Sequence, residues 1–181
     1  KRRLLERLPF EPTADQLKVV AEIEADLASP EPMARLLQGD VGSGKTLAAF
    51  LVALDVIEAG GQVAVMAPTE LLARQHAESA ARLLEPVGAR LAFLSGNARD
   101  AARRPLLGAL ASGEVDLVIG TQALFSEDVE YRNLSLVVVD EQHRFGVVQR
   151  AALARKGRSP DLLLMSATPI PRTLALILYG D

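Results

Sequence analysis

A chain of 181 residues, 49% of them hydrophobic, has the size of one ordinary domain and can bury a sizeable core. Asp and Glu (23) outnumber Lys and Arg (20), and the formal net charge of −3 excludes binding of nucleic acid through the charge of the whole domain. Cysteine is absent, which excludes disulfides and thiolate metal sites and fits a reducing cytoplasm. Every apolar run is far shorter than the roughly 20 residues of a membrane helix, so we expect no membrane association.

The chain is expected to alternate between short apolar strands and helices. A proline-broken segment, 8–12, precedes a first helix that opens with a capping box at Thr13 and Gln16 and carries an apolar stripe of Leu17, Val20, Ile23 and Leu27. The expected strands are 34–38, 62–67, 90–94, 116–119, 134–139 and 162–165. The further expected helices are 47–57, 69–84, 100–111, 147–154 and 172–178. Because the strands are almost continuous runs of Val, Ile, Leu and Ala, we predict a doubly wound α/β domain with a parallel sheet covered by helices on both faces.

Segment 39–46, Gly-Asp-Val-Gly-Ser-Gly-Lys-Thr, fits the phosphate-loop pattern Gly-x-x-x-x-Gly-Lys-Thr and lies between an expected strand and an expected helix. Glycines leave no side chain between the backbone amides and a phosphate oxygen. Lys45 would reach the β- and γ-phosphates, and the Thr46 hydroxyl would hold Mg²⁺. The alternative is a glycine turn that arose by chance. The expected nucleotide contacts are Gly39, Gly42, Ser43, Gly44, Lys45 and Thr46.

The apolar strand 134–139 ends in two neighbouring carboxylates, Asp140 and Glu141. At the carboxyl end of a parallel strand they would project into the crevice where such sheets bind ligands. Asp140 would hold Mg²⁺, and Glu141 would accept a proton from the attacking water. Since alternation along a strand would point neighbours apart, we expect the chain to leave pleated geometry here. A solvated acidic pair is the alternative, and it would be preferred if the loop at Gly39 were missing.

Two further sets of polar residues have two interpretations each. Ser166 and Thr168 follow the next apolar strand and could report which nucleotide is bound, or could simply start a helix. The Gln16 amide complements the N6 and N7 atoms of adenine, and Phe10 could pack on the base, but the capping box alone also explains Gln16. Both interpretations stay open for each set.

Thr69, Gly120 and Thr121 each lie between an expected strand and an expected helix. Helix N-termini bind phosphate through free amides and the helix dipole, so these residues are candidate contacts to a nucleic-acid backbone. A simple N-cap is the alternative. The histidines, His76 and His143, lack metal-ligand spacing, and no zinc site is expected.

With these segments in order, the chain resembles the first motor domain of the superfamily 2 helicases, a RecA-like P-loop NTPase domain. The motifs that carry the resemblance are Phe10 with Thr13 and Gln16, then 39–46, 67–72, 120–121, 140–143 and 166–169. The segments 140–146, Asp-Glu-Gln-His-Arg-Phe-Gly, and 166–174, Ser-Ala-Thr-Pro-Ile-Pro-Arg-Thr-Leu, are similar to those of the RecG branched-DNA translocases and of the Mfd transcription-repair coupling factors. Two features make the chain more similar to RecG than to Mfd: Ser43, at a position where Mfd proteins carry Phe, and the C-terminal residues 174–181.

The resemblance to RecG implies ATP and Mg²⁺ as cofactors and ATP-driven movement along duplex DNA that remodels stalled forks and Holliday junctions. The catalytic residues that it implies are Lys45, Asp140 and Glu141. Nucleotide contacts by Gln142 and His143, and coupling of hydrolysis to movement by Ser166 and Thr168, are also implied. Gln122 departs from the usual His of RecG proteins, and Glu70 departs from the Arg of DEAD-box relatives.

As partners, the resemblance implies branched or duplex DNA, bound through the full-length protein, and a second RecA-like domain of the same chain, in a monomer of the bacterial cytoplasm. Residues 1–181 are expected to be the helicase ATP-binding domain of a longer chain, without the wedge and second RecA-like domains. In such helicases the second RecA-like domain supplies an arginine finger, and an arginine of this kind contributes about 10³ to 10⁵ in turnover. We therefore expect very slow hydrolysis and no unwinding by residues 1–181 alone.

Three alternative interpretations remain. The first is the motor of an Mfd-type translocase, which an upstream polymerase-binding module would indicate. The second is a non-catalytic, nucleotide-gated binding module, which has no use for a base such as Glu141 beside the metal. A small-molecule kinase is the third, and the sequence lacks an acceptor-binding lid between the motifs.

Overall fold

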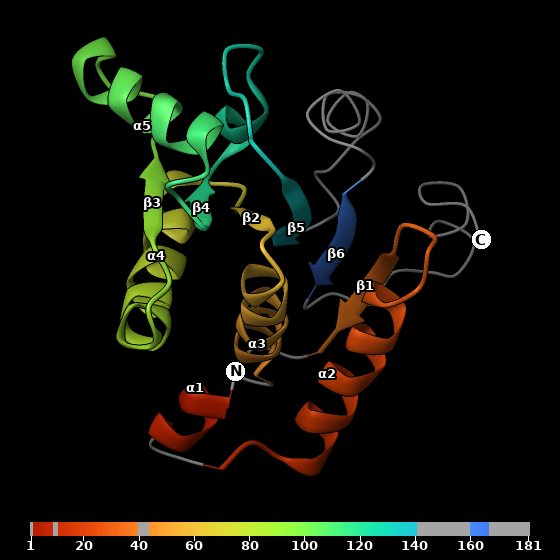
Figure 1. The fold of residues 1–181 in the computed structure, drawn as a ribbon. Coiled ribbons are helices and arrows are strands. Elements are labelled where there is room, and N and C mark those ends of the chain that lie inside the picture. The colour runs from red at the N-terminus through yellow and green to blue at the C-terminus, as the bar shows by residue number, and fades with distance from the viewer. Residues whose placement is uncertain (1, 9–10, 40–43, 141–159, 167–181) are drawn as a thin grey trace.

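The computed structural model describes residues 2–8, 11–39, 44–140 and 160–166. The described residues form one six-stranded sheet in the order β1-β6-β5-β2-β4-β3, and every neighbouring pair is parallel (Figure 1). The strands are β1 (Ala34–Gln38), β2 (Gln62–Met66), β3 (Leu91–Leu94), β4 (Leu117–Gly120), β5 (Leu134–Asp140) and β6 (Asp161–Ser166). The predicted parallel α/β fold is confirmed.

The helices begin where the sequence supplies capping residues. The Thr13 side chain accepts from the Gln16 N–H and the Gln16 side chain accepts from the Thr13 N–H, which completes the predicted capping box. Thr69 caps the helix that begins at Glu70: its side chain accepts a hydrogen bond from the Leu72 N–H at 3.2 Å. The helices are α1 (Arg2–Arg7), α2 (Ala14–Leu27), α3 (Lys45–Glu58), α4 (Glu70–Leu84) and α5 (Asp100–Ser112), with short 3₁₀ turns η1 (Glu85–Val87) and η2 (Gln122–Phe125). None of the helices in the described part of the chain is long and apolar enough to cross a lipid bilayer.

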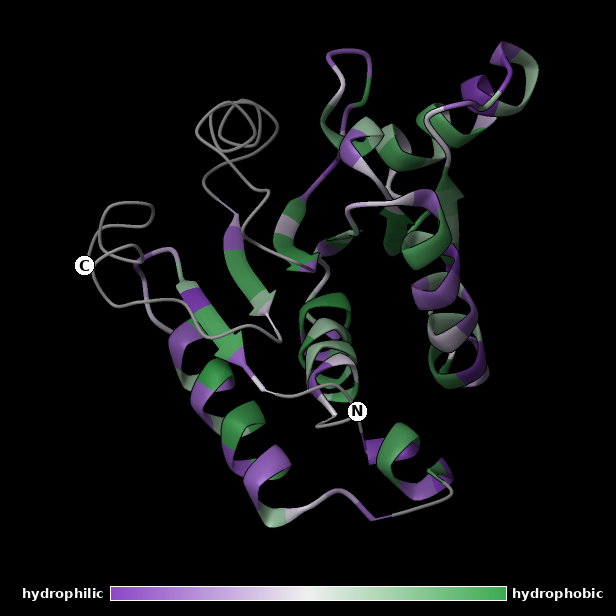
Figure 2. Cartoon of the chain, turned by 180° about the vertical axis from the view of Figure 1, so that it is seen from behind, coloured by the Kyte–Doolittle hydropathy of each residue, from purple (hydrophilic) through white to green (hydrophobic). Residues whose placement is uncertain are grey.

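The sheet separates two hydrophobic cores, because successive side chains of a strand point to opposite faces. On β2, Val63 and Val65 join one core with α1, α2, α3 and α4, whereas Ala64 and Met66 join the other with α5 and η2. α3 packs against the middle of the sheet and is hydrophobic over most of its surface, while α2 and α4 alternate between hydrophobic and hydrophilic residues (Figure 2). Helices therefore cover both faces of the sheet, as predicted.

Several predicted details are corrected by the structure. Leu17 was expected in the apolar stripe of α2, yet 42% of its surface is exposed, and Val20 and Ile23 carry the packing. The short helix α1 was not predicted; it buries Leu4 in the core. Asp140 is the last paired residue of β5 and lies opposite Met165, whereas Glu141, its neighbour at the predicted strand end, lies outside the described residues. The predicted helices 147–154 and 172–178 lie outside the described residues.

Candidate active site

The carboxyl ends of three adjacent strands bring the predicted motifs together. In the register of the sheet Gln38 of β1 lies opposite Ser166 of β6, and Met165 of β6 lies opposite Asp140 of β5. The Gly39 N–H donates to the Ser166 carbonyl at 3.2 Å, so the phosphate-loop segment starts directly on the end of β6. Because neighbouring strands are about 4.8 Å apart, the backbone of Asp140 lies about 10 Å from that of β1.

The phosphate-loop segment leads into α3 with an N-terminus that no side chain of the described residues caps. Gly44 is the N-cap in the left-handed conformation, at φ 84°, and Lys45 and Thr46 are the first helical residues. The first amides of a helix have no partner within the helix, and its N-terminus carries partial positive charge. An uncapped N-terminus that presents a lysine and a threonine is therefore suited to bind an anion.

The Lys45 ammonium group donates to the Gly39 carbonyl at 2.5 Å, across the turn of the loop. This bond ties the two ends of segment 39–46 together and keeps the charge at the mouth of the crevice. The lysine is half-buried and linked to a neutral carbonyl. A phosphate oxygen is a stronger, charged acceptor for the same ammonium group.

Gln16 takes part in the capping box of α2 and also contacts the phosphate-loop segment 39–46. A Cβ added to Gly44 would lie 1.8 Å from Gln16 Nε2, so the amide rests directly on the Gly44 backbone. Thr13, Gln16, Gly44 and Lys45 line a pocket of about 260 Å³. The two interpretations of Gln16 are thus compatible, because one side chain caps α2 and borders the pocket.

Sequence reasoning missed His76, which lies on α4. His76 Nε2 and Asp140 Oδ2 are 2.7 Å apart, and only 13% and 19% of the two side chains are exposed. The residues are 64 positions apart, and no local pattern predicts that they meet. The available signal in the sequence was weak: a histidine on the apolar stripe of an expected helix.

The residues predicted to contact nucleic acid lie in different environments. Thr69 is exposed at the N-terminus of α4. Gly120 is buried at the end of β4, where a Cβ would lie 2.5 Å from the Leu94 carbonyl oxygen, so close packing of β3 on β4 explains this glycine. Thr121 is half-buried and precedes η2, a single turn of four residues, which is the short helical turn expected after the strand 116–119. Exposure makes Thr69 the stronger candidate.

Seven predicted site residues lie outside the described part of the chain: Phe10, Gly42, Ser43, Glu141, Gln142, His143 and Thr168. Ser166 is described and is buried at the end of β6. Among the described residues, no group of three or more His, Cys, Asp or Glu side chains could hold a metal ion. A carboxylate and a hydroxyl beside an anion site nevertheless fit Mg²⁺, which keeps much of its water shell and binds through one or two protein oxygens and phosphates.

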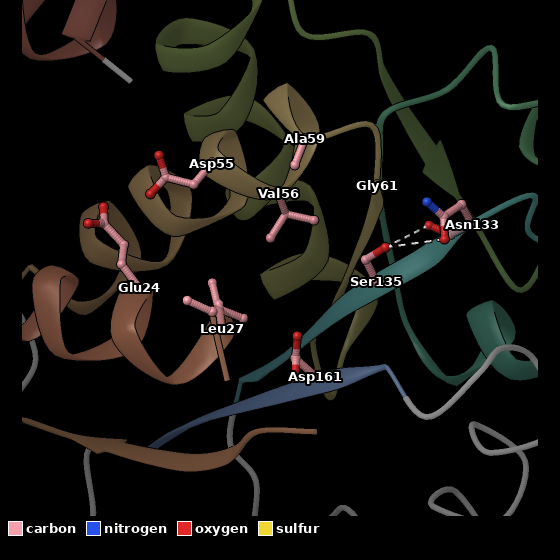
Figure 3. A pocket seen from close by; sticks show the side chains of 10 residues that line it. Glu24, Leu27, Asp55, Val56, Ala59, Gly61, Asn133, Ser135 and Asp161 are labelled. Atoms are coloured by element: carbon pink, nitrogen blue, oxygen red, sulfur yellow. Dashed lines mark hydrogen bonds between the residues drawn. The ribbon is translucent and has the colours of Figure 1, made fainter. Parts of the chain in front are cut away.

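A larger pocket of about 450 Å³ lies at the opposite, amino ends of the strands (Figure 3). Its lining includes Glu24, Asp55 and Asp161, and Ser135 donates to the Asn133 carbonyl there. Burial raises the pKa of Asp161, and the Met33 N–H, which donates to its carboxylate at 2.6 Å, opposes that shift. Parallel α/β sheets bind ligands at the carboxyl ends of the strands, so the smaller pocket beside Lys45 is the candidate site.

The fold is that of a RecA-like helicase domain. The chain belongs to the DEAD/DEAH box helicase family, whose model matches residues 13–177. It is 61% identical over its whole length to the ATP-dependent DNA helicase RecG of Treponema pallidum (strain Nichols) and 54% identical to that of Escherichia coli (strain K12). In both comparisons the chain spans 27% of the relative.

Solved structures give the same result. A structure of RecG bound to a three-way DNA junction superposes with a TM-score of 0.85 at 44% identity, covering 99% of this chain and 24% of the other. The helicase MrfA matches with a TM-score of 0.76 at 20% identity, which supports the fold alone. The RecA-like fold and the resemblance to RecG expected from the motifs are therefore confirmed.

Proposed function

We propose that this chain is the first of two RecA-like motor domains in a longer, ATP-dependent DNA helicase of the RecG type. The protein would couple ATP hydrolysis to movement along duplex DNA and so remodel branched DNA. Similarity to RecG along the entire chain supports this proposal, as does the likeness to a RecG structure bound to a DNA junction. The relatives are bacterial, and we place the protein in the bacterial cytoplasm as a monomer.

The observation that carries the proposal is the meeting of three motifs at one edge of the sheet. The Gly39 N–H bonds to the end of β6, Lys45 opens the uncapped helix α3, and Asp140 ends the strand beside β6. A lysine, helix amides and a carboxylate at neighbouring strand ends match a nucleotide that is held through its phosphates and through a metal ion.

Each residue has a distinct role in this proposal. Lys45 leaves the Gly39 carbonyl and binds phosphate oxygens, while Thr46 and Asp140 hold Mg²⁺, Asp140 through bound water. When bound, Mg²⁺ neutralises charge that develops on the phosphate oxygens. The Glu141 carboxylate accepts the proton of the attacking water. Gln16 and Phe10 contact adenine, Gln142 and His143 contact the nucleotide, and Ser166 and Thr168 couple hydrolysis to movement.

The nucleic-acid side of the proposal involves two other segments, 67–72 and 120–121, at the ends of β2 and β4. Thr69, with its exposed hydroxyl and the first amides of α4, contacts a phosphate of the DNA backbone. Gly120, the last residue of β4, and Thr121, which follows it, form a second contact through backbone amides. Such contacts read no base sequence, which suits a protein that moves along DNA of any sequence.

The test uses the full-length protein with ATP, Mg²⁺ and two DNAs, a three-way junction and a linear duplex of equal length. We expect DNA-stimulated ATP hydrolysis and separation of the junction strands. Glu141→Gln should retain ATP binding and lose turnover, Lys45→Ala should weaken both, and Glu78→Gln, an exposed acid on α4, serves as the matched control. Hydrolysis that DNA does not stimulate, or Glu141→Gln with wild-type turnover, would refute the proposal.

A further inference from the structure

His76 lies at a position of α4 that otherwise carries small apolar side chains. Ala73 and Ala80, one turn before it and one turn after it, are fully buried against the sheet. An imidazole on that stripe loses most of its contact with water and costs free energy unless a polar partner compensates. Asp140 Oδ2, at 2.7 Å from Nε2, is that partner.

The bond has a defined direction and a defined effect on the carboxylate. An ionised carboxylate has only acceptors, so His76 donates its Nε2–H to Asp140. The bond engages Oδ2 and thereby fixes the plane of the carboxylate, which determines where Oδ1 points. Both side chains are mostly buried, at 13% and 19% exposure, so water competes little for the bond.

The same helix carries the candidate DNA contact. Thr69, the N-cap of α4, precedes His76 by seven residues, which places it about 10 Å away along the axis and on nearly the same side of the helix. α4 packs mainly on β3 and β4, whereas Asp140 ends β5, so the histidine connects the helix layer to the end of another strand. A shift of α4 therefore reaches the carboxylate through a single hydrogen bond.

We propose that His76 is a positioning residue, which orients the Asp140 carboxylate toward the metal ion and links that carboxylate to α4. This inference rests on the proposed function, in which Asp140 holds Mg²⁺. Partners that orient a metal-binding carboxylate typically contribute about 10- to 100-fold to metal affinity. His76 does not touch the nucleotide itself.

The experiment measures equilibrium binding of a fluorescent ATP analogue to the full-length protein across a series of Mg²⁺ concentrations and in EDTA. His76→Leu introduces an apolar side chain of similar size that has no hydrogen-bond donor. His76→Gln introduces an amide N–H donor with a similar reach. Glu78→Gln is the control on an exposed face of the same helix. Circular dichroism melting verifies that each variant folds; if His76→Leu does not, His76→Asn, whose amide is too short to reach Oδ2, replaces it.

We expect His76→Leu to raise the Mg²⁺ concentration for half-maximal binding about 10- to 100-fold, and to leave binding in EDTA unchanged. His76→Gln should restore most of the loss. In an Asp140→Ala background, His76→Leu should have no further effect, because its action passes through the carboxylate.

Two results would overturn the inference: an unchanged Mg²⁺ dependence in the donor-free variant, or an equal effect of His76→Leu with and without Asp140. Failure of the wild-type protein to bind the nucleotide with Mg²⁺ would instead refute the proposed function, and the inference with it.

Discussion

Replacing Gly44 by alanine tests whether the capping box of α2 is joined to the phosphate-loop segment. The substitution has two costs. First, φ at Gly44 is 84°, in the left-handed region, which costs an L-residue about 1–2 kcal/mol. Second, the new Cβ would lie 1.8 Å from Gln16 Nε2 and 3.0 Å from its Cδ, so the amide must move away.

Moving the Gln16 amide breaks the 2.8 Å bond that its Oε1 accepts from the Thr13 N–H. An exposed bond of this kind contributes about 0.5–1 kcal/mol. Gly44→Ala should therefore lower the free energy of unfolding by about 1.5–3 kcal/mol, the backbone term and the capping term together. Gln16→Ala removes the same capping bond in advance, so in that background Gly44→Ala should cost only the backbone term, about 1–2 kcal/mol.

Gly60 provides the matched control, because its φ is 93° and no atom lies within 4 Å of an added Cβ. Gly60→Ala should cost the backbone term alone. The assay is urea unfolding monitored by circular dichroism, and nucleotide affinity is measured in parallel. If Gly44→Ala proves no more costly than Gly60→Ala, or if its cost is the same with and without Gln16, the contact between the two segments does not exist as described.

Three further predictions follow from individual contacts. Thr69→Asp should keep the cap of α4 and the stability of the fold but weaken DNA binding by charge repulsion, whereas Thr69→Ala should lose about 1 kcal/mol of stability; equal DNA affinity in wild type and Thr69→Asp would remove Thr69 from the interface. Burial raises the pKa of Asp161 above 3.8, so the protonated form is favoured in the folded state and stability is lost as pH rises through the folded pKa. Asp161→Asn should flatten that fall in urea unfolding as the pH is raised from the ordinary pKa of an aspartate, and an unchanged pH profile would contradict the burial argument. His76→Leu should reduce ATP turnover in the presence of DNA more than ATP turnover in its absence. Equal reduction of these two rates would argue against coupling through α4.

Several functional residues could be predicted from the sequence because their signals are local. Segment 39–46 carries its pattern in consecutive residues, and Asp140 follows a short run of β-branched and apolar residues that is typical of a buried strand. The capping box at Thr13 and Gln16 is likewise set by a spacing of three residues. In each case the residues that define the feature are close enough in the chain to constrain one another directly.

The alternation of strands and helices, the parallel sheet and the motifs at the strand ends could all be predicted from local patterns in the chain. Folding adds the order of the strands, the contact of His76 with Asp140, the packing of Gln16 on Gly44 and the exposure of Leu17, none of which a local pattern indicates. Periodicity and capping report interactions within one element, at separations of a few residues. Which strands become neighbours depends instead on how whole helices pack on the sheet, and no short segment of the chain contains that information.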